Sequence, residues 1–203
     1  MEMSKRKKSN RKIHTRDLIE RILIVCEGEK TEPNYFRKFL IDENKCYVKT
    51  TGEGYNTVRL VQKAIKVQKE SMPPYNKVWC VFDRDSFPAK DFNKAIKEAK
   101  KKGIEVAYSN EAFELWYFLH FDYCDSAMSR DQYQEKLSDL LGHKYEKNCE
   151  TMYQELLYIQ LMAIRNAERL LNSYDSFNPE NNNPSTTVHK LVEELNKRLL
   201  RHK

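Results

Sequence analysis

Two continuous apolar runs dominate the hydrophobic pattern of the chain. They are Glu20–Cys26 (ERILIVC) and Val78–Phe82 (VWCVF), both rich in β-branched or aromatic residues and bounded by charge. A run that is apolar at successive positions is typical of a strand buried on both faces, as in a parallel sheet. Each run therefore predicts a central strand.

Apolar positions at helical spacing lie between and after these strands. Helices are expected from Thr31 (as N-cap), from Asn56 or Thr57 and over about 90–102, ending at Gly103, and weaker strands at 46–51 and 104–108. Residues 20–109 thus follow the order β-α-β-α-β-α-β. This order predicts an α/β fold, with a parallel sheet, covering helices and right-handed crossovers.

Beyond residue 110 the pattern predicts only helices, at about 111–121, 129–141, 150–173 and 185–201. We expect three parts in the chain: a basic flexible arm (1–16), an α/β core (17–110) and a helical extension packed on the core (111–203).

Positive charge is concentrated in the arm. The chain has 36 Lys and Arg against 30 Asp and Glu, and residues 1–16 hold seven of the basic and one of the acidic residues, so the rest balances 29 against 29. Such an arm either contributes salt-sensitive affinity for phosphates or serves only as a solvated tail. The sequence lacks a run of 18 apolar residues and an apolar N-terminus, so we expect neither a membrane span nor a secretory signal, and a cytoplasmic location.

The five cysteines indicate a reducing compartment. They are scattered, odd in number and without a C-x-x-C pair: Cys26, Cys46, Cys80, Cys124 and Cys149. Buried reduced thiols explain this pattern better than a disulfide framework or a zinc site.

Acidic residues stand at the carboxyl ends of both strong strands. Glu27 follows the first strand, and Asp83 and Asp85 follow the second. Parallel strands bring these ends to one sheet edge, and an extended Asp-x-Asp points both acids to the same side. Crowded carboxylates repel one another unless a cation lies between them, and their hard oxygens suit Mg²⁺ or Mn²⁺. The pattern predicts a divalent metal site for phosphodiester chemistry, although a single acid at a strand end or helix start is common.

Five segments together carry a family resemblance. An apolar strand ending in Glu-Gly, two crossover units and a strand ending in Asp-x-Asp resemble the toprim domain of topoisomerases, bacterial primases and overcoming-lysogenization-defect nucleases. More closely, the chain resembles the RloB-like family, small toprim proteins of bacterial restriction and phage-defence loci, over about residues 12–200. The matching segments are Val25–Phe36, Phe82–Asp85, Ser109–Trp116, Leu119–Phe121 and Asn183–His189.

The resemblance implies roles for the three acids. Glu27 matches the toprim glutamate, which acts in proton transfer or metal binding, and Asp83 and Asp85 match the paired metal-binding aspartates. The tyrosine nucleophile of topoisomerases has no match here, which favours cleavage over strand passage. The resemblance does not carry over a substrate. We expect DNA or RNA as the partner, with proteins of a defence locus as further partners.

Further residues are secondary candidates. Glu114 lies in the apolar segment Ala112–Leu119, so its buried carboxylate needs a partner: a metal, backbone N–H groups or an arginine. Glu29 or Glu32 can bind a second metal, but for Glu32 we favour the simpler explanation, a position that is favourable for the helix dipole. Phosphate contacts are expected from Lys30, Asn56, Ser185 and His189, although Ser185 also suits a helix N-cap, and His120 is expected in the core.

Three functions fit these residues. The first is a metal-dependent nuclease of the toprim type. The second is a non-catalytic module that binds nucleic acid or a partner protein through the arm and the helical part. The third is a small-molecule phosphohydrolase, since Asp83-Arg84-Asp85 superficially resembles the haloacid-dehalogenase motif, but this reading leaves Glu27 without a role.

Overall fold

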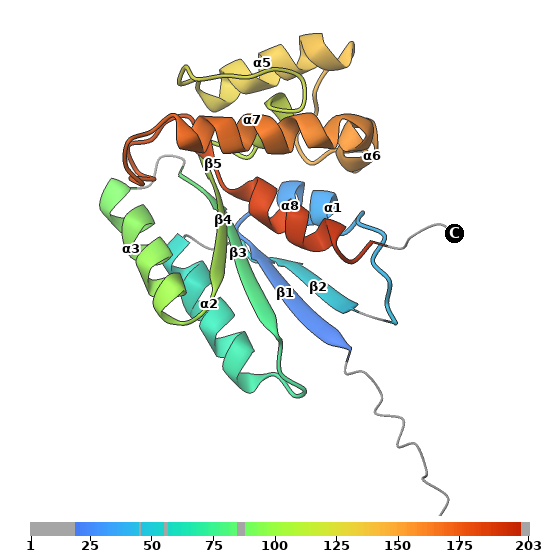
Figure 1. Cartoon of the computed structure of the whole chain (residues 1–203), viewed down its shortest axis with the longest axis vertical. Helices are drawn as coiled ribbons and strands as arrows, with labels where there is room; N and C mark the ends of the chain where they lie inside the picture. The colour runs from blue at the N-terminus through green and yellow to red at the C-terminus, as the bar shows by residue number, and fades with distance from the viewer. Residues whose placement is uncertain (1–18, 45, 55–56, 85–87, 200–203) are drawn as a thin grey trace, which may run out of the picture.

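The computed structural model of the chain describes residues 19–44, 46–54, 57–84 and 88–199 (Figure 1). A five-stranded sheet in the order β2-β1-β3-β4-β5 forms its centre. The first four strands are parallel, and β5 pairs antiparallel with β4, so the expected α/β class is confirmed. The strands are β1 (Glu20–Cys26), β2 (Cys46–Gly52), β3 (Lys77–Asp83), β4 (Glu105–Asn110) and β5 (Ser185–Thr186).

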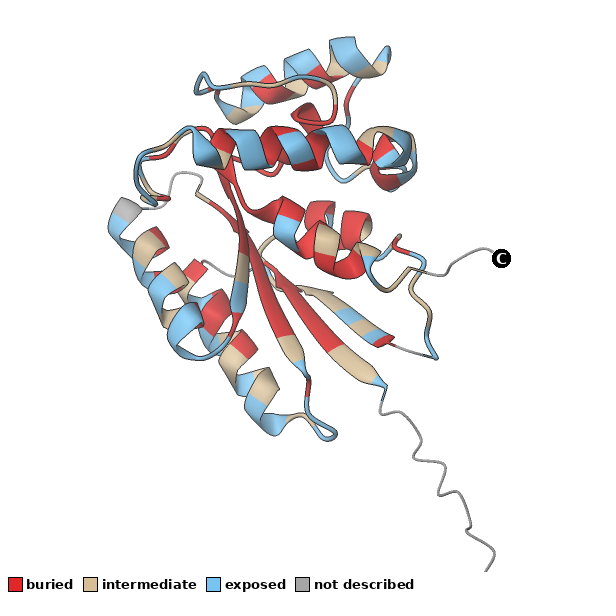
Figure 2. Ribbon diagram, viewed as in Figure 1, coloured by how far each residue is buried: buried red, intermediate tan, exposed pale blue. Residues whose placement is uncertain are grey.

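Successive side chains of the central strands belong alternately to two hydrophobic clusters, one on each face of the sheet. In β1, Ile22 and Ile24 belong to one cluster, whereas Leu23 and Val25 belong to the other. Successive side chains of a strand point to opposite faces, so each face has its own core. Figure 2 shows β1 and β3 buried along most of their length. The continuous apolar runs in the sequence reflect this burial on both faces.

Two long helices cover one face, α2 (Thr57–Glu70) and α3 (Ala89–Lys101). Leu60 and Phe92 are fully buried beneath them. Gly103 follows α3 with φ +67°, a conformation that glycine adopts at little cost, which explains why the helix ends there. Both helices and the expected strands at 46–51 and 104–108 appear within a few residues of the predicted bounds.

Shorter helices cover the other face and the carboxyl edge. Figure 1 shows α1 and α8 across this face, with α5 and α7 stacked beyond them. Their side chains share one aromatic-rich cluster with the sheet, in which the Tyr35 ring packs edge-on against Phe113, Trp116 and Tyr153. The helices are α1 (Thr31–Phe36), α4 (Glu114–Phe118), α5 (Arg130–Leu141), α6 (Met152–Leu156), α7 (Gln160–Asn172) and α8 (Val188–Asn196), with a 3₁₀ turn at Leu157–Ile159.

The prediction that Thr31 caps α1 is wrong. Lys30 occupies the cap position, without a side-chain hydrogen bond, and Thr31 is the first helical residue. The Thr31 hydroxyl instead donates to Asn148 Oδ1 at 2.8 Å. A partner 117 residues away in the chain replaces the local capping bond, and sequence spacing carries no sign of it.

The prediction that only helices follow residue 110 is wrong at Ser185–Thr186, which form β5. Thr186 Oγ1 donates to the Tyr108 carbonyl at 2.8 Å, so its hydroxyl helps to hold β5 against β4. The expected helix over 150–173 is divided into α6, a 3₁₀ turn and α7, and that over 111–121 is reduced to α4. Two paired residues are too short a strand to show a period of two in the sequence.

All five cysteines are free thiols, as expected, and Cys26, Cys46 and Cys80 are buried. None of the described helices combines the length and the apolar character needed to cross a membrane. The basic arm and the predicted site residues Asn56 and Asp85 lie outside the described residues.

Candidate active site

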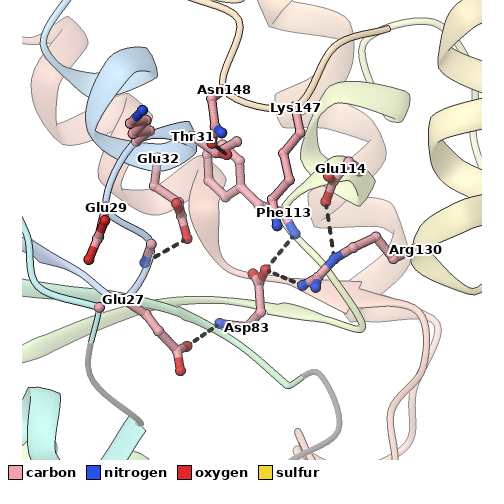
Figure 3. Close-up of a pocket in the computed structure, with 13 residues that line it drawn as sticks. Glu27, Glu29, Thr31, Glu32, Asp83, Phe113, Glu114, Arg130, Lys147 and Asn148 are labelled. Carbon is pink, nitrogen blue, oxygen red and sulfur yellow. Dashed lines mark hydrogen bonds and ion pairs between the residues drawn. The ribbon is translucent and has the colours of Figure 1, made fainter.

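A cavity of about 600 Å³ opens at the carboxyl edge of β1 and β3 (Figure 3). It is bounded by the loop after β1, the end of β3, the start of α4, the start of α5 and the loop before α6. The residues that line it are Glu27, Gly28, Glu29, Lys30, Thr31, Glu32, Gly54, Asp83, Phe113, Glu114, Arg130, Lys147 and Asn148. The sheet edge predicted to carry the site therefore does carry a strongly acidic cavity.

Asp83 lies at the base of this cavity as the last residue of β3, only 8% exposed. Its Oδ2 accepts from Phe113 N at 3.0 Å and from Arg130 Nη2 at 3.3 Å. Its Oδ1 has no hydrogen-bond partner within the described part of the chain. Burial first, then the Glu32 and Glu114 carboxylates, raise the pKa of Asp83 well above its usual value, and Arg130 opposes the rise. One oxygen of a buried carboxylate is thus available to a ligand.

Glu27 approaches Asp83 from the main-chain side. Its Oε2 accepts from Asp83 N at 3.2 Å, and its own N–H donates to the Val81 carbonyl at 2.8 Å. Alternation along the strands directs the Asp83 side chain toward α4 and α5, and Figure 3 shows Glu27 on the other side of the Asp83 main chain. The structure therefore brings Glu27 and Asp83 together but does not set their carboxylates face to face.

Glu32 is more deeply buried in the cavity than its position at a helix start suggests. It is 5% exposed, and its Oε1 accepts from Gly28 N at 3.4 Å. Burial raises its pKa, hydrogen bonds from backbone N–H groups oppose the rise, and the Glu114 carboxylate adds to it. A Cβ at position 28 would displace the Glu32 carboxylate from its present place beside the loop after β1. Glu32 is more than a helix-dipole residue, because its charge lies inside the cavity.

Glu114 begins α4 and is 2% exposed. Its Oε1 accepts from Gln134 Nε2 at 3.2 Å and from the Tyr145 hydroxyl at 3.3 Å, and its Oε2 lies 3.8 Å from Arg130 Nε. Of the partners considered from the sequence, the arginine is therefore present. Arg130 bridges Glu114 and Asp83, so one guanidinium compensates two buried acids.

Positive charge also enters from the loop before α6. Figure 3 shows the Lys147 side chain reaching into the cavity toward Asp83. Its neighbour Asn148 adopts φ +71°, a left-handed conformation that asparagine tolerates. Asn34 Nδ2 donates to the Asn148 carbonyl at 3.0 Å, in addition to the Thr31 bond to the Asn148 side chain. These two bonds fix the loop to α1 and so position Lys147.

The donor set suits a hard divalent cation in its chemistry. Carboxylate oxygens dominate the cavity, and Asp83 Oδ1 lacks a protein partner among the described residues. No three acidic, histidine or cysteine side chains in the described ranges lie close enough to hold one ion. An ion here would have one or two carboxylate ligands, with water and substrate phosphate completing the shell, which is common for Mg²⁺.

The residues predicted to contact phosphate divide into two groups. Lys30 lines the cavity, whereas Ser185 and His189 are buried elsewhere. Ser185 Oγ donates to the Asn182 carbonyl at 2.6 Å, and burial lowers the pKa of His189 to about 4. Neither is placed for contact with a substrate in this cavity, because both are buried, in β5 and α8, and neither lines the cavity. His120 is a core residue, as expected, with Nδ1 2.9 Å from the Trp116 carbonyl.

Helical spacing contains a signal for the burial of Glu32, which is only a secondary candidate among the predicted site residues, and for Arg130, which is not among them. Glu32 precedes Tyr35 and Phe36 by three and four positions, so it lies on the apolar face of α1. Arg130 precedes Tyr133 and Leu137, the buried residues of α5, by three and seven positions. A charged residue on the buried face of a helix needs a partner inside the protein. No comparable signal exists for Lys147.

A family model described as RloB-like protein matches residues 22–195, from β1 into α8. The matched region includes every residue that lines the cavity. No curated protein and no solved structure gives a significant match to the chain.

Proposed function

The chain belongs to the RloB-like protein family, and from this premise we propose that the cavity around Asp83 binds a divalent cation and hydrolyses phosphodiester bonds of DNA or RNA. The observation that carries the proposal is the buried Asp83 carboxylate, with one oxygen unpartnered among the described residues and a pKa raised by burial and by Glu32 and Glu114. A buried carboxylate that has other carboxylates as neighbours is stabilised most simply by a cation.

Each group in the cavity has a task in this proposal. Asp83 Oδ1 would hold Mg²⁺ or Mn²⁺, and either Glu32 or Glu114 would supply a second oxygen. When bound, the cation supplies positive charge that stabilises an in-line phosphoryl displacement. Glu27 accepts a proton from the attacking water or adds a further metal ligand. Lys147 and Lys30 pair with substrate phosphates as point charges.

The setting of the activity follows from the resemblance to toprim proteins of restriction and phage-defence loci. We expect the chain to act in the bacterial cytoplasm, with partner proteins from such a locus, against invading nucleic acid. Asp85 is expected to join Asp83 as a metal ligand, as the Asp-x-Asp motif implies.

A second candidate is a non-catalytic module that binds nucleic acid or a partner protein. The observation that favours it is the Arg130 guanidinium, which lies 3.3 Å from Asp83 Oδ2 and neutralises the acid without a metal. In that case the acids serve stability alone.

Cleavage assays separate the two candidates. The full chain is incubated with supercoiled plasmid, single-stranded DNA and tRNA, with Mg²⁺, Mn²⁺ or excess chelator. We expect metal-dependent cleavage of at least one substrate and a loss of about 1,000-fold or more in Asp83→Asn, equivalent to about 4 kcal/mol of transition-state stabilisation. The matched control is Glu105→Gln, which removes an exposed acid from the opposite edge of the sheet, at the start of β4, and should retain full activity.

Cleavage in excess chelator, or full activity in Asp83→Asn, contradicts the proposal. If the wild-type chain binds nucleic acid but cleaves none of the three substrates with either metal, the second candidate is correct.

A further inference from the structure

Helix α3 carries a stripe of lysines on its outer surface. Lys90, Lys94, Lys97 and Lys101 follow one another at spacings of four, three and four residues, and all four are exposed. Residues at these spacings share one side of a helix. Phe92, Ala95 and Ala99 are fully buried beneath α3. The stripe is therefore a continuous line of amino groups about 16 Å long, at about 1.5 Å per residue.

Ion pairs within the described part of the chain leave these lysines uncompensated. None of the ion pairs between described residues includes a lysine of α3. The stripe lines a groove of about 820 Å³, to which Glu98 and Glu180 contribute the carboxylates. Four amino groups against two carboxylates leave a surplus of positive charge in a concave surface.

The adjacent helix α2 differs although it is equally exposed. Its Lys63 lies 3.9 Å from Glu53, and its Lys66 lies 4.0 Å from Glu70. On α2, then, two of the lysines have acidic neighbours within ion-pair distance. A general need for solubility would affect both helices alike, so the unpaired charge on α3 calls for a separate explanation.

The stripe begins at the same edge of the sheet as the acidic cavity. Helix α3 follows β3, whose last residue is Asp83, so α3 starts at the carboxyl edge of the sheet and runs back along its face (Figure 1). Lys90 stands in the first turn of α3, seven residues after Asp83. A polyanion with one phosphate in the cavity can therefore continue along α3.

We propose that the α3 stripe binds the sugar-phosphate backbone of the nucleic acid whose cleavage is proposed above, and the inference rests on that proposed function. The stripe contacts phosphates only, so its contribution is independent of base sequence and decreases as salt rises. It holds the strand beyond the scissile bond, whereas the cavity holds the scissile phosphate itself.

The test measures binding without turnover, by fluorescence anisotropy of the full chain in excess chelator. The probes are a labelled DNA duplex and an RNA duplex of the same sequence, titrated over about 50–200 mM salt. The stripe variant is Lys94→Gln/Lys97→Gln/Lys101→Gln. The control, Lys66→Gln/Lys69→Gln/Lys190→Gln, removes the same charge from exposed positions on α2 and α8. Circular dichroism checks that both variants fold.

We expect the stripe variant to bind at least one duplex about tenfold or more weakly, with the slope of log affinity against log salt reduced by about 2–3. The control should lose much less. Equal losses in the two variants mean that only net charge matters, and this result, or no loss in either, overturns the inference. Binding of anionic lipid vesicles with no binding of either duplex also overturns it. If the stripe variant loses binding but the wild-type chain cleaves no substrate, the proposed nuclease activity is contradicted and the proposed role of the stripe in binding is not.

Discussion

The two faces of the sheet are covered by layers of very different character. The α2–α3 layer consists of two regular helices over the smaller of the two cores, in which aliphatic side chains pack with the rings of Phe82, Phe92 and Tyr108. The layer formed by α1 and α4–α8 is made mainly of short helices, packs many aromatic rings and buries polar groups such as Glu32 and Glu114. The first layer supports the sheet, while the second delivers charged side chains to its carboxyl edge.

Buried apolar groups and buried acids affect the free energy of unfolding in opposite directions. Burial of apolar side chains stabilises both layers, but burial of Asp83, Glu32 and Glu114 together costs free energy that Arg130 offsets only in part. We therefore expect the buried acids of the cavity to lower the free energy of unfolding, and a bound cation to raise it.

The largest expected effect on stability is that of Arg130→Gln. This change leaves Asp83 and Glu114 without their shared guanidinium, and we expect the free energy of unfolding to fall by about 2 kcal/mol near neutral pH. The loss should be smaller at about pH 4.5 than near neutral pH, because the raised pKa of Asp83 means that this carboxylate takes up a proton at a higher pH than an ordinary aspartate, and the protonated acid needs no counter-charge. Urea unfolding at the two pH values measures both quantities.

The control for this change is Arg165→Gln, the same substitution at an exposed position of α7. It should change stability by less than about 0.5 kcal/mol. An equal loss in Arg130→Gln at both pH values would show that Arg130 acts through packing and not through charge.

A smaller effect of opposite sign is expected from Glu32→Gln. The amide oxygen keeps the bond from Gly28 N and removes the buried charge, so stability should rise by about 1 kcal/mol near neutral pH, equivalent to about 2–4 °C in Tm. The pKa of Glu32 is raised in the folded chain, so this acid lowers the stability of the wild type as pH rises through that pKa. The advantage of the variant should therefore shrink as pH falls.

Thermal unfolding across a pH series measures this prediction, with Glu168→Gln on the exposed side of α7 as the control. A destabilised Glu32→Gln at every pH would mean that the ionised carboxylate is a net stabilising group, and the comparison between the two layers would then be wrong.

Sequence reasoning succeeded where structure depends on local pattern. Strands β1 and β3 are apolar on both faces, and α2 and α3 present one apolar stripe each, so run length and period were enough to place them. Outside the basic arm the positive and negative charges balance, so the sequence does not predict that the α3 lysines lack ion-pair partners among the described residues. Pairing depends on neighbours in space.

It failed where tertiary contacts decide the outcome. At the break between α6 and α7 the apolar residues Leu157 and Tyr158 are exposed, so the apolar pattern continues through the break and the sequence predicts a single helix. The predicted acids Glu27 and Asp83 do meet, but the acids that most strongly raise the pKa of Asp83 are Glu32 and Glu114. Both reach it only through packing of α1 and α4.

The central claim is that the Asp83 cavity binds a divalent cation, and calorimetric titration of Mn²⁺ into the full chain tests it most directly. We expect saturable binding by the wild type and by Glu105→Gln, and affinity about tenfold or more weaker in Asp83→Asn, a loss of about 1.4 kcal/mol or more. Absence of saturable binding by the wild type, or equal affinity in Asp83→Asn, would contradict the claim.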